Sequence, residues 1–227
     1  MSDLIEPSLL NDQAYRALKG ALVSGLMRAG EMVSLQDLVK RFHMPLAPIR
    51  EAVKRAASEK FLRIVPKRGI YVMEATSERL LECFGLRMLI DREGARKLAR
   101  RVRAGLAQPA LDALQTAHQA LYERALVEVD QVLAAEAYVL DWQLHLTLSG
   151  AIHNPLIEEI YAINREKIRL MQNTRPSLPD RVAPSLAEHL DILRTIASGD
   201  PEAADQKVCD HYRQTLRWWG ILNPTFD

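Results

Sequence analysis

The sequence predicts a mainly α protein in which an N-terminal winged helix-turn-helix domain, residues 1–73, precedes an all-α antiparallel helical bundle, residues 77–222. Helical periodicity covers most of the 227 residues, and strand-like runs occur only near residues 62–72. Residues 11–73 carry 12 Lys and Arg against 5 Asp and Glu, whereas residues 74–227 carry 18 against 22. A basic N-terminal third on a mildly acidic body is typical of a nucleic-acid-binding module joined to a second domain.

The composition indicates a sizeable core and no membrane segment. Apolar residues make up 48% of the chain, but no run of about 18 apolar residues could form a transmembrane helix. Asp3 and Glu6 lie where a signal peptide would carry positive charge, so we expect a cytoplasmic protein. Cys83 and Cys209 are too few for a disulfide framework and lack the spacing of a zinc knuckle, which makes them expected core residues.

The first two helices are expected to support a third. The first runs from about residue 11 to residue 25, and Gly30 follows its end. Its apolar stripe consists of Tyr15, Leu18, Ala21, Leu22 and Leu26. Ser34 precedes Asp37 by three positions, which is close to a capping box and predicts a short second helix ending near Phe42.

The third helix is expected to start after a break at His43-Met44-Pro45 and to reach about Glu59. Pro48 fits its first turn, because a proline there removes no intrahelical hydrogen bond. One side of this helix is apolar, and the other sides are basic. Two short helices joined by a tight turn, the second of them basic, are typical of a DNA-binding helix-turn-helix. We expect Arg50 to contact a base or a phosphate, and Lys54 and Arg55 to contact phosphates.

A basic β-hairpin is expected next. Residues 62–65 and 70–72 are rich in β-branched side chains, and Pro66-Lys67-Arg68-Gly69 separates them. A hairpin in this position is a wing. Lys67 and Arg68 would reach phosphates, and Gly69 permits a positive φ or a close approach to a backbone.

The remainder of the chain reads as a series of long helices separated by proline or glycine. We expect them at residues 77–104, 109–127, 130–149, 155–173, 184–198 and 201–220. Six helices of this length favour an antiparallel bundle. The longest connection is expected at residues 173–183.

Four side chains of metal-ligand type fall on core-facing positions of three of these helices. Asp141 and His145 are four residues apart and therefore share a helix face, while His189 and His211 each lie on the apolar stripe of a later helix. Burying three imidazoles and a carboxylate without partners would cost several kcal/mol. A shared divalent cation would remove that cost, and this donor set suits Zn²⁺, Ni²⁺ or Mn²⁺.

The other histidines carry no such pattern. His118 lies on an apolar stripe without a second ligand nearby in sequence, so we expect it in the core or at a helix interface. His43 and His153 lie in expected turns beside helix ends, where capping or solvent exposure is the simpler interpretation.

The chain resembles the GntR superfamily of bacterial transcription regulators, in its FCD (FadR-like) subfamily. The winged-helix resemblance rests on Gly30-Glu31, on Pro48-Ile49-Arg50-Glu51-Ala52 and on Pro66 to Val72. The FCD resemblance rests on Asp141-x-x-x-His145, Asn154-Pro155, Glu188-His189 and His211. It implies a homodimeric regulator whose metal, held by Asp141, His145, His189 and His211, helps to bind a small carboxylate effector.

The resemblance also implies further contacts. Gln36 in the second helix and Ala47 at the start of the third are expected at DNA, and Arg87 is the family-based candidate for the effector. A surface pair of Arg87 with Asp91 is the alternative. Asn173 and Arg175, beside the long connection, are further effector candidates. Where family members commonly carry Ser-Arg before the third helix, this chain has Pro45 and Leu46, so an N-cap side chain is lost, at a cost of about 1 kcal/mol.

The sequence therefore predicts an effector-responsive DNA-binding repressor without enzymatic activity. A homodimer would place two recognition helices about 34 Å apart on a pseudo-palindromic operator. Two alternatives remain: a regulator for which the metal ion itself is the signal, and a metal-dependent hydrolytic enzyme in which the ion activates water.

Overall fold

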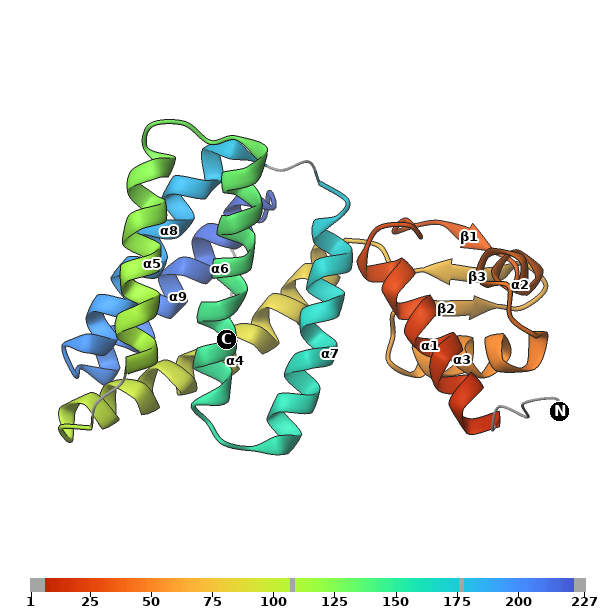
Figure 1. Cartoon of the computed structure of the whole chain (residues 1–227), viewed down its shortest axis with the longest axis horizontal. Coiled ribbons are helices and arrows are strands. Elements are labelled where there is room, and N and C mark those ends of the chain that lie inside the picture. Colours follow the sequence, from red (N-terminus) through yellow and green to blue (C-terminus); the bar gives the residue numbers. More distant parts are fainter. Residues whose placement is uncertain (1–6, 107–108, 176–177, 223–227) are drawn as a thin grey trace, which may run out of the picture. The chain divides into compact units, whose positions relative to one another are not determined.

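The computed structural model describes residues 7–106, 109–175 and 178–222, and these residues form two compact units. The first unit contains the chain up to Arg79 and the segment that begins at Arg165. The second contains Leu80–Asn164 and the chain from the next helix onward. The predicted fold class is confirmed: a small sheet with helices in the N-terminal part is followed by helices alone (Figure 1).

The first unit is a winged helix. Its elements are α1 Pro7–Val23, β1 Met32–Val33, α2 Leu35–Phe42, α3 Leu46–Ser58, β2 Leu62–Val65 and β3 Gly69–Val72. The sheet is antiparallel with strand order β1-β3-β2. Leu18, Ile49 and Phe61 are fully buried and form part of the core between α1, α3 and the sheet. At the start of α2 the predicted capping box is present, with Ser34 and Asp37 each bonded to the other's backbone N–H.

The first strand was not predicted, because two residues are too few for an alternating pattern. Met32 and Val33 pair with Tyr71 and Ile70 of β3. Gly69 is needed for this pairing: its φ is +125°, and a Cβ there would lie 2.7 Å from the carbonyl oxygen of Val33. The positive φ expected of Gly69 is confirmed, and the backbone that approaches it here is that of Val33 in the sheet. The expected contact of Gly69 with DNA stays a prediction.

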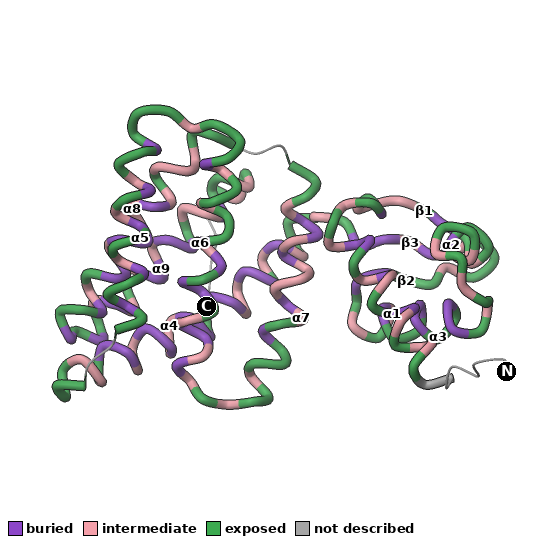
Figure 2. The backbone as a smooth tube through the Cα atoms, viewed as in Figure 1, coloured by how far each residue is buried: buried purple, intermediate pink, exposed green. Residues whose placement is uncertain are grey.

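The second unit is a bundle built from six helices of the described chain. They are α4 Ser77–Arg103, α5 Pro109–Ala125, α6 Gln131–Gly150, α7 Pro155–Gln172, α8 Pro179–Ala197 and α9 Pro201–Trp218, although α4 begins and α7 ends within the first unit. Asp130 caps α6 through Leu133 N, and Asp200 caps α9 through two backbone N–H groups. Figure 2 shows the buried residues on the inner faces of these helices. Within the described chain, every helix is too short or too polar to cross a bilayer.

The start of α8 differs from the prediction. We expected a connection as far as residue 183, but the helix begins at Pro179, and Pro184 lies inside it. A proline at the first helical position is favourable because its N–H would be unpaired in any case. Pro184 is the sixth residue of the helix, where its missing N–H removes one i→i−4 hydrogen bond. The additional turn carries Arg181, which belongs to the candidate site described below.

The crossing of α4 with α6 depends on Gly94. A Cβ at this position would lie 1.9 Å from the carbonyl oxygen of Leu148, so no side chain fits without separating the two helices. We therefore predict that Gly94→Ala lowers the free energy of unfolding by about 1–3 kcal/mol or more, measured by urea denaturation.

Gly150→Ala is the matched control. Gly150 is the last residue of α6, and nothing lies within 4 Å of a Cβ built there. This variant should be as stable as the parent or slightly more stable. Equal stability of the Gly94 variant and the parent would contradict the close α4–α6 contact.

Candidate functional site

One face of α3 presents polar side chains to solvent. Pro48, Ile49, Ala52 and Val53 are buried, while Ala47, Arg50 and Lys54 lie on the exposed side at a spacing of three and four residues. Pro45 provides no side-chain cap, as expected. Lys54 pairs with Glu51 at 2.8 Å. In the described part of the chain the Arg50 guanidinium has no ion-pair or hydrogen-bond partner, so it is available to a ligand.

Arg55 is engaged within the first unit. Its guanidinium lies 3.9 Å from the ring centroid of Tyr15, and it forms ion pairs with Asp12 at 3.3 Å and Glu59 at 3.4 Å. These contacts join α3 to α1. The expected phosphate contact of Arg55 stays a prediction, and it would compete with these partners.

The remaining predicted DNA contacts lie on the same unit. Gln36 is exposed on α2, and Lys67 and Arg68 are exposed in the turn between β2 and β3. Lys67 has a φ of 62°, and Arg68 N donates to Val65 O at 3.0 Å, which closes the turn. The wing therefore presents two adjacent basic side chains.

In the second unit the four predicted ligands converge. Asp141 and His145 come from α6, His189 from α8 and His211 from α9, and one ligand atom of each lies within 4.8 Å of the others. Asp141 Oδ1 lies 3.4 Å from Nε2 of His189 and 3.7 Å from Nε2 of His145. Ligand atoms about 3.4 Å apart suit tetrahedral coordination at about 2.1 Å from a common centre.

Carboxylates outside this cluster orient two of the imidazoles. His145 Nδ1 lies 2.6 Å from Asp91 Oδ2, and His211 Nδ1 lies 2.8 Å from Glu188 Oε2. A carboxylate accepts, so each Nδ1 carries a proton and each Nε2 presents a lone pair. Carboxylate acceptors behind metal-binding histidines are common in metalloproteins. Glu188 is held in turn by two hydrogen bonds from Arg181, at 2.6 and 2.7 Å.

The environment keeps two of the imidazoles uncharged. Burial lowers the pKa of His189 well below its usual value, and nearby His211 adds to the effect. Burial, together with His145 and Arg87, lowers the pKa of His211 in the same way. Burial and Arg87 also oppose protonation of His145, but Asp91 and Asp141 outweigh them and raise its pKa.

The residues present fit a divalent cation. Nε2 of His211 and both ring nitrogens of His189 are buried and lack a hydrogen-bond partner among the described residues. Unpaired buried nitrogen atoms are costly, and a cation would use two of their lone pairs. With three imidazoles and one carboxylate, the donor set suits Zn²⁺, Ni²⁺ or Mn²⁺.

Arg87 lies beside this cluster rather than on the surface. It is 2% exposed, and its guanidinium contacts Nε2 of His145 and the hydroxyl of Tyr212. The alternative of a surface pair with Asp91 is therefore wrong, although Asp91 does lie 3.7 Å from Arg87 Nε. Asp91 also accepts hydrogen bonds from Tyr161 at 2.8 Å and Tyr212 at 2.7 Å.

The other expected candidates lie elsewhere. Asn173 and Arg175 belong to the first unit, where Asn173 Nδ2 donates to Val23 O at 2.7 Å. His43 and His153 are exposed in turns, as expected. His118 is fully buried on α5, as expected, but its ring centroid is only 5.3 Å from that of His189.

Several residues around the cluster were not predicted to act there. Tyr161, Arg181 and Tyr212 were not singled out at all. Asp91 was considered only as a partner of Arg87, Glu188 only as part of the family resemblance, and His118 only as a core residue. Asp91 and Tyr212 had a usable signal, since polar side chains sit at helix positions that face the core. Arg181 had none, because it lies in a segment predicted as a connection.

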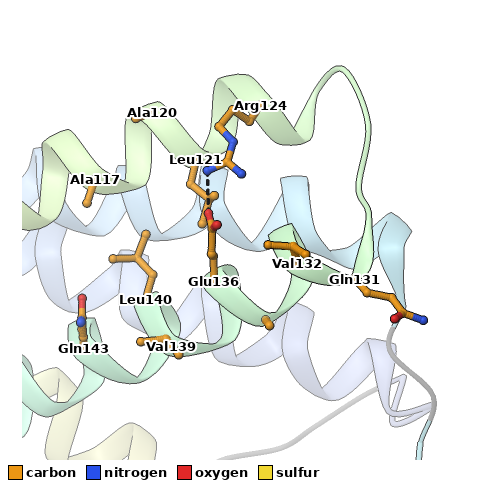
Figure 3. Close-up of a pocket in the computed structure, with 11 residues that line it drawn as sticks. Ala117, Ala120, Leu121, Arg124, Gln131, Val132, Glu136, Val139, Leu140 and Gln143 are labelled. Atoms are coloured by element: carbon orange, nitrogen blue, oxygen red, sulfur yellow. Dashed lines mark hydrogen bonds and ion pairs between the residues drawn. The ribbon is translucent and has the colours of Figure 1, made fainter.

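A groove between α5 and α6 is a different feature. It has a volume of about 700 Å³ and is lined mainly by Ala, Val and Leu side chains, with Arg124 and Glu136 paired across it (Figure 3). Small-molecule sites need a few polar groups that converge on the ligand, and here the two charged groups bind each other at 2.6 Å. The groove is therefore a poor match for a carboxylate.

Two family models match the chain. The one described as bacterial regulatory proteins, gntR family, covers residues 10–72, and the one described as FCD domain covers residues 82–214. The HTH-type transcriptional repressor RspR of Escherichia coli K12 is 25% identical over 209 residues, 90% of this chain and 86% of that protein. The gluconate operon transcriptional repressor of Bacillus subtilis is 32% identical over 74 residues, 33% of this chain and 30% of that protein.

Solved structures share the fold. E. coli McbR/YncC has a TM-score of 0.67 at 17% identity, and a putative GntR transcriptional regulator from Rhodococcus sp. RHA1 has a TM-score of 0.70 at 19% identity. Each alignment covers 94% of this chain and 99% of the other. The chain belongs to the GntR family of bacterial DNA-binding transcription regulators and carries an FCD domain in its helical part.

Proposed function

We propose that this regulator is a repressor that binds a pseudo-palindromic operator as a homodimer, and that a divalent cation and a small carboxylate effector in the FCD domain modulate this binding. The family consists of transcription regulators rather than enzymes, and its members bind operators and typically act as dimers. One observation carries the ligand part of the proposal: four ligand-type atoms converge beside the buried guanidinium of Arg87.

The DNA part of the proposal rests on the first unit. The outer side of α3 carries exposed Ala47, Arg50 and Lys54 and would enter the major groove of DNA. Gln36 of α2 would lie nearby, at the DNA backbone. Lys67 and Arg68 of the wing would contact phosphates. Arg50 has no competing partner among described residues, and its fork of donors suits a guanine or a phosphate.

The carboxylate part rests on the charge of Arg87. This guanidinium contacts the same nitrogen of His145 that a cation would bind. A divalent cation and a guanidinium side by side in a buried site repel each other unless an anion lies between them. A carboxylate has two oxygens, so it would satisfy both, and Arg87 would give up its contact with His145 to bind it.

The bound cation supplies a Lewis-acidic position for the effector, and the chain's own residues do the rest. Asp141, His145, His189 and His211 hold the cation. Asp91 and Glu188 keep the lone pairs of His145 and His211 directed at it. A differential effector affinity of about 1–3 kcal/mol between two states of the dimer is sufficient to switch operator binding.

Salt dependence tests the DNA contacts. If about six phosphates are neutralised, operator affinity should fall about a thousandfold between 50 and 200 mM salt. Replacing both Lys67 and Arg68 by Ala should lower the slope of log affinity against log salt by about 2, as measured by fluorescence anisotropy. Arg100→Ala, an exposed change on α4, should leave the slope unchanged. A wing variant with the parental slope would show that the wing does not contact phosphate.

A thermal-shift screen tests the effector site. Hydroxy, dicarboxylic and sugar acids are added to Zn²⁺-loaded and to chelator-stripped protein. An acid at one hundred times its dissociation constant should stabilise the loaded form by about 2.7 kcal/mol, and both Arg87→Gln and His189→Ala should abolish this shift. His153→Ala removes an exposed histidine and is the control.

The same screen separates the alternatives. An acid that stabilises the stripped form equally well would contradict a cation-dependent site. If no acid shifts the loaded form but Zn²⁺ alone changes operator affinity, the ion is the signal and the carboxylate proposal is wrong.

The pH dependence of stability tests whether the imidazoles are neutral. The pKa values of His189 and His211 are depressed in the folded state, so their stabilising contribution is present above the unfolded value of about 6.5 and is lost as the pH falls below it. Each histidine should cost the chelator-stripped protein about 0.8 kcal/mol between pH 7.5 and 6.0.

A double variant provides the comparison. His189→Gln combined with His211→Gln should flatten the decline in the free energy of unfolding by about 1.6 kcal/mol over this range, measured by urea denaturation. His145, with its raised pKa, contributes in the opposite direction and is present in both proteins. Identical pH profiles would mean that the two imidazoles are not held neutral.

A further inference from the structure

His118 has one paired and one unpaired ring nitrogen. It is 0% exposed on α5, and its Nδ1 lies 2.8 Å from the carbonyl oxygen of Leu114, one turn earlier in the helix. A carbonyl oxygen only accepts, so Nδ1 carries the proton and Nε2 presents a lone pair. Nε2 of His118 is buried, and no described residue donates to it.

The neighbouring imidazole, that of His189, would carry an N–H donor without an acceptor when a cation is bound. The rings of His118 and His189 lie 5.3 Å apart between centroids, at an interplanar angle of 73°. His189 Nε2 is the nitrogen 3.4 Å from Asp141 Oδ1 and faces the cation position. With Nε2 bound to a cation, Nδ1 of His189 must carry a proton, and that N–H finds no acceptor among the described residues.

The three histidines of the cluster differ in whether their Nδ1–H has a hydrogen-bond acceptor. Asp91 accepts from His145, and Glu188 accepts from His211, but no carboxylate or carbonyl of the described residues accepts from His189. A metal-binding histidine almost always donates its second N–H to an acceptor, which fixes the orientation of the ring. Two adjoining rings carry a buried nitrogen without a partner among the described residues, His211 Nε2 and His118 Nε2. His211 Nε2 belongs to the proposed cation site, so His118 Nε2 is the acceptor left for His189.

We propose that His118 is the positioning residue for His189, accepting the Nδ1–H of His189 at its own Nε2 when the cation is bound. This inference rests on the proposed cation site. The hydrogen bond from His118 Nδ1–H to Leu114 O orients His118, His118 orients His189, and α5 is thereby joined to the cluster on α6, α8 and α9. Because His118 is a neutral acceptor, it orients the ligand without adding a third negative charge behind the histidines.

Zn²⁺ affinity of the full-length protein, measured by competition with a chromophoric chelator, tests this role. His118→Leu keeps much of the volume but has no acceptor, and it should weaken Zn²⁺ binding by about 10–100-fold. In His118→Gln the side-chain oxygen can take the place of Nε2, so this variant should bind within a few-fold of the parent. Both variants alter the core, so a purely structural role would weaken both or neither.

A measurement on the parent protein does not depend on any variant. In Zn²⁺-loaded, ¹⁵N-labelled protein, a scalar coupling should connect His189 Nδ1 with His118 Nε2 across the N–H···N hydrogen bond. Its presence supports the proposal even if a variant fails to fold. If the coupling is absent, or if His118→Leu binds Zn²⁺ with the parental affinity, the proposed role of His118 is wrong but the cation site is not affected. If the parent binds no Zn²⁺ at micromolar concentrations, the cation site itself is wrong and the proposal falls with it.

Discussion

The buried carboxylate of Asp91 is the interaction on which the FCD domain's candidate site depends. It accepts from Tyr161, Tyr212 and His145 at 2.6–2.8 Å, so α4 is bonded to α7, α9 and α6 at one point. A buried carboxylate is tolerated only when its oxygens are fully hydrogen-bonded. That requirement fixes the tautomer of His145 and holds Arg87, one turn away on α4, next to the same ring.

The charges around this point explain why a cation and an anion would bind together. With the histidines neutral, Asp91, Asp141 and Glu188 face Arg87 and Arg181, which leaves one negative charge in excess. A divalent cation would change the net charge of the site from −1 to +1, and a monocarboxylate would then bring it to zero. Low-dielectric sites favour such balance because each uncompensated charge is expensive. On the proposed function, the cation and the effector would therefore support each other's binding, which would make the site suitable for a switch.

The sequence predicted most of the fold because long helices and the basic hairpin carry strong periodic signals. It also predicted Asp141, His145, His189 and His211 as a group, since ligand-type residues at core-facing positions need a reason to be there. Periodicity placed Asp91 and Glu188 on helices but could not reveal which of them stands behind which ligand. Arg181, seven residues before its partner Glu188, lay in a segment assigned to a connection, and β1 is too short to produce a pattern.

His118 illustrates the same limit. Its place in the core was predicted correctly, but the partner proposed for it, His189, lies on α8, about seventy residues further along the chain. The pairing depends on which of its two nitrogens carries the proton, and only the contact with Leu114 O determines this. The neighbouring ring of His189 is brought there by packing between helices, which has no counterpart in the spacing of residues along one helix.

The proposed function depends on four side chains of the helical bundle that would hold one divalent cation. Anomalous diffraction from crystals of the Zn²⁺-loaded protein, recorded at the zinc edge, would locate this cation. We expect a single peak per protomer, bonded to Asp141 and to Nε2 of His145, His189 and His211 at about 2.0–2.2 Å, with His118 outside bonding distance. A peak elsewhere, or none between α6, α8 and α9, would contradict it.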